Sequence, residues 1–187
     1  MRVVAGKYGS RPLKAVPGMN TRPTTDKIKE SIFNMLGGMM QGQVVLDFYG
    51  GSGALAIEAV SRGAVKAIIC EKHRPAIQTI YQNIDMTKEP HYFEVLAGDN
   101  CRSLQAFVSS HPNVTFDTVL LDPPYKTQKI IEDIEWLEDL QCLSQDCTIM
   151  CETDHHTDLP LQISDFTCIK DKTYGQTTVR IYERGNL

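Results

Sequence analysis

Short apolar runs alternate with amphipathic segments over most of the chain. Short, mostly apolar runs, which predict strands, lie at residues 44–46, 67–70, 92–96, 116–121 and 147–151. Apolar residues at helical spacing follow them at 54–61, 77–84, 104–108 and 130–140. Buried strands separated by helices are typical of a parallel, doubly wound sheet. Two later segments, 163–169 and 177–183, predict an antiparallel pair that closes the sheet.

The first part of the chain has a different pattern. Two short strand-like runs, 3–5 and 13–16, are separated by glycine, serine and proline, which predicts a small hairpin. Thr24 or Thr25 can then cap a helix that ends at Gly37-Gly38. We therefore expect a hairpin extension over residues 1–20 and a single globular domain over residues 21–187.

Glycines and polar side chains follow the first three predicted strands at their carboxyl ends, where sheets of this kind bind ligands. A glycine turn lets the backbone approach a ligand closely, and Glu71 could accept hydrogen bonds from a ribose diol. The side chains after the third strand could read an adenine edge. The predicted cofactor-binding residues are Asp47, Tyr49, Gly50, Gly51, Gly53, Glu71, Asp99 and Asn100.

A dinucleotide site would share several of these features. Gly51-x-Gly53-x-x-Ala56, with Glu71 further along, matches a dinucleotide-binding fingerprint, and this spacing does not separate nicotinamide from other adenosine cofactors. Asp47 favours S-adenosylmethionine among these adenosine cofactors. A carboxylate at the mouth of the loop would repel a pyrophosphate, whereas it suits the ammonium of S-adenosylmethionine, which has no phosphate.

The fourth predicted strand ends in Asp122-Pro123-Pro124-Tyr125. Two prolines remove two backbone donors and fix φ, which leaves a rigid turn with outward carbonyls. Asp122 and the Pro123 carbonyl could accept both N–H bonds of an exocyclic amine, while Tyr125 stacks on the base. We therefore assign Asp122, Pro123, Pro124 and Tyr125 as the catalytic residues.

Charge is distributed unevenly along the 187 residues. The formal net charge of the chain is −4. Residues 1–36 hold seven basic and two acidic side chains and so carry a charge of +5, while the remaining residues carry a charge of −9. This asymmetry indicates an anionic partner held at one end. The predicted RNA-binding residues are Lys7, Arg11, Lys14 and Arg22. The acidic residues of 132–139 would repel RNA, so we expect their helix to face away from it.

The six cysteines do not predict a metal site. Three of them and two histidines fall within residues 142–156, but Cys147 and Cys151 lie on a predicted strand, which holds positions four apart too far from each other to share one zinc ion. No secretory signal or membrane-spanning run is evident, so we expect reduced thiols and a cytoplasmic protein with no membrane partner.

Taken together, several motifs make the sequence similar to the RsmD family of bacterial 16S ribosomal RNA guanine-N2 methyltransferases. The resemblance runs from about Arg2 to Arg184 and rests on residues 21–26, 47–53, 61–64, 122–125 and 174–175. It implies a class I S-adenosylmethionine-dependent methyltransferase with a Rossmann-like, seven-stranded, mostly parallel α/β sheet. It also implies a guanine of the 966 type as target, and 16S ribosomal RNA or a small-subunit assembly intermediate as partner. We expect the protein to be a monomer.

Two departures from the family pattern stand out. Tyr49-Gly50 replaces the more usual Phe-Ala, which should change the packing of the loop without abolishing binding. Gly9-Ser10 lies in a hairpin that many relatives make more basic, which would weaken RNA affinity.

Three other functions compete with this interpretation. An adenine-N6 methyltransferase would use the same turn, but no added DNA-recognition domain fits in this chain. A non-catalytic RNA-binding ribosome-assembly factor would have no need of the intact turn and loop. A nicotinamide oxidoreductase lacks an obvious partner residue for hydride transfer. The turn alone does not separate a guanine amine from an adenine amine.

Overall fold

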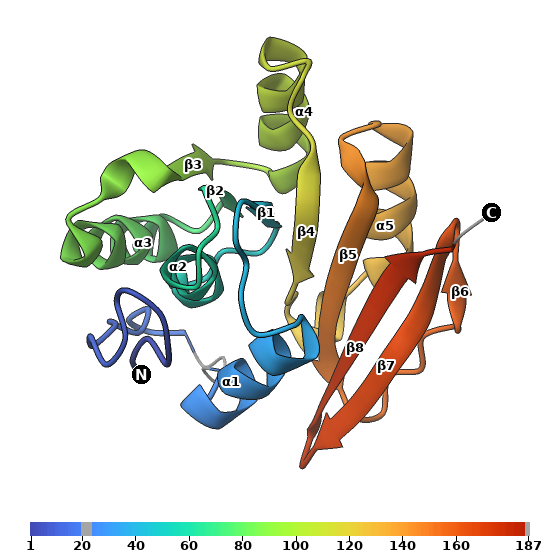
Figure 1. The fold of residues 1–187 in the computed structure, drawn as a ribbon, viewed down its shortest axis with the longest axis horizontal. Helices are drawn as coiled ribbons and strands as arrows, with labels where there is room; N and C mark the ends of the chain where they lie inside the picture. Colours follow the sequence, from blue (N-terminus) through green and yellow to red (C-terminus); the bar gives the residue numbers. More distant parts are fainter. Residues whose placement is uncertain (20–23, 186–187) are drawn as a thin grey trace.

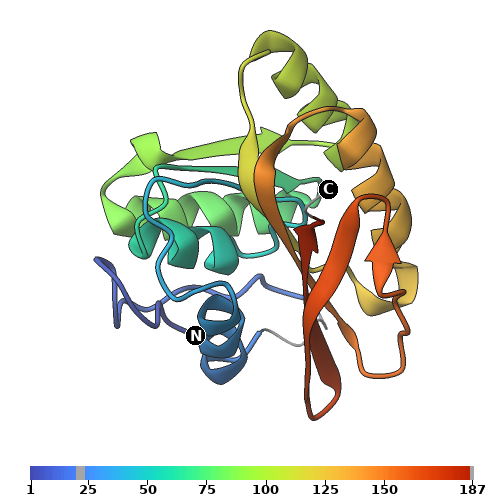
Figure 2. The same ribbon diagram turned by 45° about the vertical axis from the view of Figure 1, so that its right-hand side comes forward.

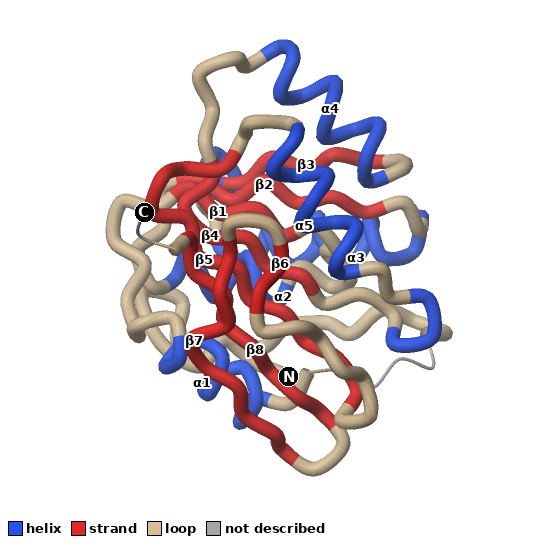
Figure 3. The backbone as a smooth tube through the Cα atoms, turned by 90° about the vertical axis from the view of Figure 1, so that its right-hand side faces the viewer, coloured by secondary structure: helices blue, strands red, loops and turns tan. Residues whose placement is uncertain are grey.

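The computed structural model describes residues 1–19 and 24–185. Their strands form one continuous twisted sheet in the order β3-β2-β1-β4-β5-β8-β7-β6 (Figures 1 and 3). The strands are β1 (Val44–Asp47), β2 (Lys66–Glu71), β3 (Phe93–Ala97), β4 (Phe116–Leu121), β5 (Leu143–Asp154), β6 (Gln162–Ile163), β7 (Phe166–Tyr174) and β8 (Thr177–Arg184). The first five are parallel, β8 pairs antiparallel with β5, and β7 pairs antiparallel with β8.

Helices cover both faces of this sheet. They are α1 (Asp26–Met35), α2 (Ala54–Ser61), α3 (Arg74–Thr87), α4 (Asn100–Ser110) and α5 (Ile130–Asp139), with 3₁₀ turns η1 (Pro90–Tyr92) and η2 (Tyr125–Thr127). The N-terminal segment (residues 1–19), α1, α2 and α3 pack into one apolar cluster, and α4 and α5 pack into another on the opposite face (Figure 2). None of the helices among the described residues is both long and apolar enough to cross a membrane.

The predicted class I architecture is confirmed, with one addition and several different strand bounds. The predicted 163–169 strand, for example, is divided between β6 and β7. The addition is β6, two residues long, which pairs with β7 beyond the expected seven strands. β5 begins before the predicted 147–151 run, and β7 continues to Tyr174 instead of ending at residue 169. Both extra stretches are largely polar and exposed, so pairing with a neighbouring strand, rather than burial, keeps them extended.

The predicted N-terminal hairpin is reduced to a single bridge. Arg2 pairs antiparallel with Pro12, and the Val3 amide donates to the Arg11 carbonyl at 2.9 Å, but no regular strand forms. Three apolar side chains of the segment, Val3, Tyr8 and Leu13, are buried in the same cluster as α2 and α3. The segment is thus held mainly by its packing against α2 and α3 and less by hydrogen bonds within itself.

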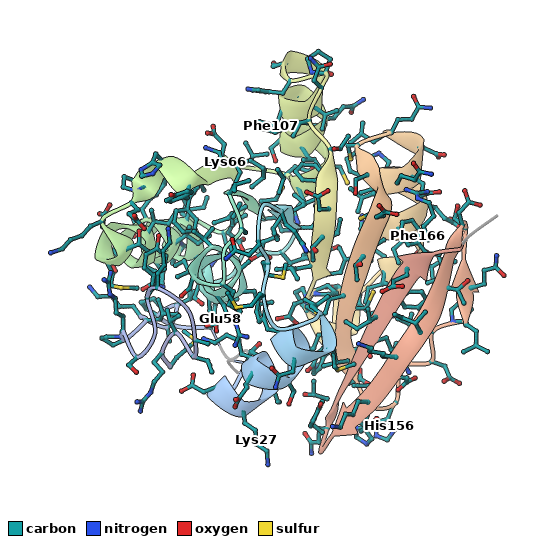
Figure 4. All side chains as sticks on the ribbon, in the orientation of Figure 1. Lys27, Glu58, Lys66, Phe107, His156 and Phe166 are labelled. Carbon is teal, nitrogen blue, oxygen red and sulfur yellow. The ribbon has the colours of Figure 1, made fainter. Side chains whose placement is uncertain are left out.

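A buried ionic network anchors this segment to α2. The Glu58 carboxylate accepts hydrogen bonds from the backbone amides of Val4 at 2.8 Å and Ala5 at 3.0 Å. The same carboxylate pairs with Arg62 at 2.9 Å and lies 3.8 Å from the ammonium of Lys29 on α1. Figure 4 shows Glu58 between α2 and the N-terminal segment. One acid therefore ties the segment, α1 and α2 together.

Candidate active site at the carboxyl ends of the strands

The loop from Asp47 to Gly53 joins β1 to α2 and lies tight against β2. The Gly50 amide donates to the Cys70 carbonyl at 2.9 Å. A Cβ at Gly50 would lie 2.5 Å from Cγ2 of Ile69 and 3.1 Å from the Cys70 carbonyl oxygen. Glycine therefore fits here without any shift of β2, whereas alanine would require one. Gly53 starts α2 at φ +81°, a conformation that glycine adopts at little cost.

Asp47 is a buried carboxylate without a partner. It is 1% exposed, and neither of its carboxylate oxygens has a hydrogen-bond partner among the described residues. The backbone amides of Tyr49 and Ala56 lie nearby and offset the effect of burial only in part. Burial, and then the charge of Glu71, raise the pKa of Asp47 to about 7. Buried polar groups are normally paired, so this carboxylate marks a ligand site.

Glu71 connects the end of β2 to the glycine loop. Its Oε2 accepts from the Gly51 amide at 2.8 Å, and its Oε1 accepts from the amides of Lys72 at 2.8 Å and His73 at 2.9 Å. A carboxylate offers about four acceptor positions, so roughly one remains for a ligand hydroxyl. Glu71 can therefore shape the loop and still bind a ribose.

Asp99 and Asn100 lie at the same edge of the sheet, and both have local roles. Asp99 caps α4 by accepting from the Arg102 amide at 2.9 Å. The Asn100 side-chain amide donates to the Phe48 carbonyl at 2.6 Å, which ties the end of β3 to the loop after β1. The three strand ends therefore form one connected cradle.

Tyr49 extends this cradle to the opposite face of the sheet. Its hydroxyl donates to the Asp133 carboxylate on α5. That the helix of residues 132–139 faces away from RNA stays a prediction. Asp133, however, is buried, so it is not part of an exposed acidic face. It follows Ile130 by three positions and precedes Ile134, so it shares their inward face. Its role could not be inferred from a run of acidic residues.

The turn after β4 brings a second acid beside the predicted catalytic residues. Leu121 pairs in register with Cys151, so Asp122 stands next to Glu152 on β5. The Tyr125 hydroxyl lies 3.1 Å from the Thr177 hydroxyl and 3.4 Å from Oε1 of Glu152. Burial, then Glu152 and Asp47, raise the pKa of Asp122 well above its usual range. Pro123 is buried and Pro124 is exposed in this turn.

A pocket lies beside this turn. Its lining residues come from the start of α1, the end of β5 and the turn between β7 and β8, elements that Figure 1 shows near one another. Of the predicted site residues that the structure describes, only Tyr125 lines the pocket. The other lining residues are Thr24, Thr25, Ile28, Glu152, Tyr174, Gly175, Gln176 and Thr177. Glu152 follows the predicted run 147–151, so the rule used for the first four strand ends would have found it. Thr24, Thr25, Tyr174 and Gly175 lie in two of the segments that carry the family resemblance, although no role in the site was predicted for them.

The predicted RNA-binding residues lie along the N-terminal segment, and two of them make internal contacts. Lys7 pairs with Glu89 at 2.9 Å, and its ammonium lies 3.8 Å from the centroid of the Tyr92 ring. Arg11 donates to the Met86 carbonyl at 3.3 Å. Lys14 has an exposed side chain, and Arg22 lies outside the described residues.

The cysteine-rich stretch belongs to the core. Cys142, Cys147 and Cys151 are buried in the apolar cluster that includes α5. In the part of the chain that the structure describes, no group of three or more histidine, cysteine, aspartate or glutamate side chains is placed to hold a metal ion.

Known proteins resemble the chain over almost its whole length. A family model described as "Conserved hypothetical protein 95" matches residues 1–183. The chain is 40% identical to the Bacillus subtilis protein named "Putative rRNA methyltransferase YlbH" over 184 residues, 98% of this chain and 99% of that protein. It is 30% identical to the Escherichia coli K12 "Ribosomal RNA small subunit methyltransferase D", over 98% of this chain and 90% of that protein.

Solved structures agree with these sequence matches. A structure titled "Putative methyltransferase yhhF from Escherichia coli" is 29% identical and superposes with a TM-score of 0.83, covering 100% of this chain and 99% of that chain. A conserved hypothetical protein from Streptococcus pyogenes is 39% identical with a TM-score of 0.77, covering 84% of this chain and 95% of that chain.

Proposed function

The chain belongs to the RsmD family, described as conserved hypothetical protein 95, and from this premise we propose that it methylates the exocyclic N2 amine of a guanine in 16S ribosomal RNA. The family membership makes it an S-adenosylmethionine-dependent ribosomal RNA methyltransferase of class I fold. The guanine target and its N2 atom are the proposal. Its support is the acceptor-rich turn of Asp122 and Pro123 beside a pocket that contains a second buried acid.

The cradle at the first three strand ends fits S-adenosylmethionine. The buried, unpartnered Asp47 suits the cofactor's ammonium, and the remaining acceptor position of Glu71 suits a ribose hydroxyl. Asp99 and Asn100 are placed at the edge where the adenine would lie. When bound, the cofactor supplies a methyl group on a positively charged sulfur, ready for in-line displacement.

The turn after β4 would hold the amine. The lone pair of guanine N2 is delocalised into the ring, so the amine is a poor nucleophile. Hydrogen bonds from its two N–H groups to Asp122 and the Pro123 carbonyl favour a pyramidal nitrogen and align it for attack. Asp122 then takes the released proton. Its raised pKa makes it a better proton acceptor than an ordinary carboxylate.

The target base must leave its stack to reach this turn. Tyr125 lies at the pocket with its hydroxyl held by Thr177, so its ring orientation is fixed before the base arrives. A fixed ring of this kind suits stacking against a flipped-out base. We further propose that the enzyme acts as a monomer in the cytoplasm, on RNA or on an assembling small subunit.

Mass spectrometry of nucleosides from 16S ribosomal RNA tests the proposal. RNA from a strain without the gene should lack one N2-methylguanosine, and the wild-type gene should restore it while an Asp122→Ala gene does not. Loss of an N6-methyladenosine instead would identify the adenine enzyme. An unchanged set of methylated nucleosides, with accumulating subunit precursors, would favour an assembly factor.

Calorimetry tests the cofactor site separately. Glu71→Ala should weaken S-adenosylmethionine binding by about 2 kcal/mol, typical of hydrogen bonds to a charged acceptor. The exposed Glu94 on β3 offers a matched control, because Glu94→Ala removes the same charge away from the loop. Tight binding of NAD, with no response to S-adenosylmethionine, would contradict the assignment of the cradle.

A further inference from the structure

Glu152 is a buried acid that neither the fold nor the catalytic turn fully uses. It is 4% exposed, and its Oε1 is approached by the Tyr125 hydroxyl at 3.4 Å. Its Oε2 has no hydrogen-bond partner among the described residues, although the Thr24 hydroxyl lies close to the carboxyl group. The residue also lines the pocket beside the turn. An oxygen left in this state is costly unless a ligand supplies a donor.

The distribution of such atoms in the described residues supports a ligand. Four buried side-chain atoms there lack a partner: both carboxylate oxygens of Asp47, Oγ of Ser144 and Oε2 of Glu152. Three of these four belong to acids at the carboxyl ends of β1 and β5. Since Asp47 belongs to the cofactor cradle, Glu152 is the acceptor left for the substrate.

The sheet register decides which part of the substrate Glu152 can meet. Leu121 pairs with Cys151, so the acids that follow them stand side by side at two neighbouring strand ends. A guanine presents two adjacent donors, N1–H and the N2 amine, on its Watson–Crick edge. An adenine presents its N6 amine beside N1, which is an acceptor and would face the carboxylate oxygen unfavourably.

We propose that Glu152 is the specificity-determining residue of this pocket and accepts the N1–H of the target guanine while Asp122 and the Pro123 carbonyl hold the N2 amine. This inference rests on the proposed function, because it assumes that the target is a guanine amine. It adds the reason why the same Asp-Pro-Pro-Tyr turn would select guanine over adenine. An N1–H donor at this point would also satisfy Oε2 of Glu152, the oxygen of this carboxylate that has no donor among the described residues.

A modified base separates this role from a structural one. 2-Aminopurine keeps the exocyclic amine at C2 but has an unprotonated N1, so it lacks the donor that Glu152 would read. Once the methylated position has been mapped, 16S ribosomal RNA can be ligated around a synthetic segment with guanosine or 2-aminopurine there. Wild-type enzyme should methylate the guanosine RNA at least about 100-fold faster, as expected of a site built around a substrate donor.

Glu152→Gln should reduce this preference at least tenfold, because the glutamine amide can donate to the N1 of 2-aminopurine. Comparing the guanosine-to-2-aminopurine rate ratio of the wild-type enzyme with that of Glu152→Gln cancels the different intrinsic reactivity of the two amines. Glu152→Asp, which retains the charge, should keep the preference at a lower rate. Tyr125→Phe is the matched control: it removes the hydroxyl near Glu152 and should slow both substrates equally.

Two outcomes would overturn the inference. The first is that wild-type enzyme methylates both RNAs at similar rates. The second is that Glu152→Gln slows the methylation of both RNAs equally, as is expected of Tyr125→Phe. The latter would make Glu152 a positioning residue for the turn, and unchanged S-adenosylmethionine affinity would verify that the variant is folded. If wild-type enzyme forms no N2-methylguanosine at all, the proposed function itself fails, which is a separate and recognisable result.

Discussion

Replacing Glu58 with glutamine should loosen the N-terminal segment and destabilise the whole chain. Glu58 is fully buried, and its carboxylate accepts from the amides of Val4 and Ala5 and pairs with Arg62. Glutamine keeps one acceptor oxygen but turns the other into an NH₂ group. That group would face a donor or a cation, so at least one of these contacts becomes repulsive.

The expected loss of unfolding free energy can be estimated from the contacts that the two cations keep. Removing one partner of a buried ion pair costs about 3–5 kcal/mol, because the other charge stays buried. Here both cations keep a second contact: Arg62 donates to the Gly38 carbonyl at 2.9 Å, and Lys29 donates to the Arg2 carbonyl. We therefore expect Glu58→Gln to lower the free energy of unfolding by about 3 kcal/mol, the lower end of that range. The total stability of a protein of this kind is about 5–15 kcal/mol.

Urea unfolding and hydrogen exchange together measure this change. With a slope of about 2–3 kcal/mol per molar urea for a chain of this size, Glu58→Gln should lower the midpoint by about 1 M or slightly more. The amides of Val4 and Ala5 should also exchange faster than those of the sheet. RNA affinity should fall while S-adenosylmethionine affinity is retained, since the cradle does not touch Glu58.

The control is Glu30→Gln, an exposed glutamate on α1 whose replacement changes the net charge identically. It should alter stability by no more than about 0.5 kcal/mol. If Glu58→Gln matches this control in both midpoint and amide exchange, the buried network does not anchor the segment and the reasoning is refuted.

Three further predictions follow from the site. Burial raises the pKa of Asp47 to about 7, so the cofactor-free chain should lose stability as pH rises from about 4 to about 7. Asp47→Asn should make that slope of the urea midpoints smaller, while other carboxyls with a raised pKa, such as Asp122, keep part of it. The variant should also weaken S-adenosylmethionine binding; an identical slope in both proteins would contradict this. Tyr125→Ala should abolish methyl transfer, whereas Tyr125→Phe should lower it about fivefold, the cost of roughly one hydrogen bond, and cofactor affinity should stay unchanged in both. Equal turnover in all three proteins would exclude stacking on this ring. An Arg11→Ala, Lys14→Ala double variant should bind RNA more weakly, with a salt slope smaller by about one per lost phosphate contact. The exposed Arg102 on α4 serves as control, and an unchanged slope in the double variant would place the RNA surface elsewhere.

Much of the fold could be predicted from local pattern. The helix over Ala54–Ser61 and the strand over Phe116–Leu121 have the predicted bounds. Each is almost wholly buried, so the apolar residues of the sequence mark where it begins and ends. The sequence alone also located the glycine loop after β1 and the Asp-Pro-Pro-Tyr turn, since both follow a strand end directly. The polar extension of β7 escaped prediction because its strand conformation depends on pairing with β8.

Tertiary structure alone decided what several acids do. Glu152, Asp133 and Glu58 are each a glutamate or aspartate in an ordinary local context, yet all three are buried with different partners. The pairing of β4 with β5 puts Glu152 beside Asp122, the inward face of α5 brings Asp133 to Tyr49, and the fold of residues 1–19 over α2 gives Glu58 its amides. The role of a carboxylate depends on the donors and charges around it, and contacts between residues distant in the chain supply these.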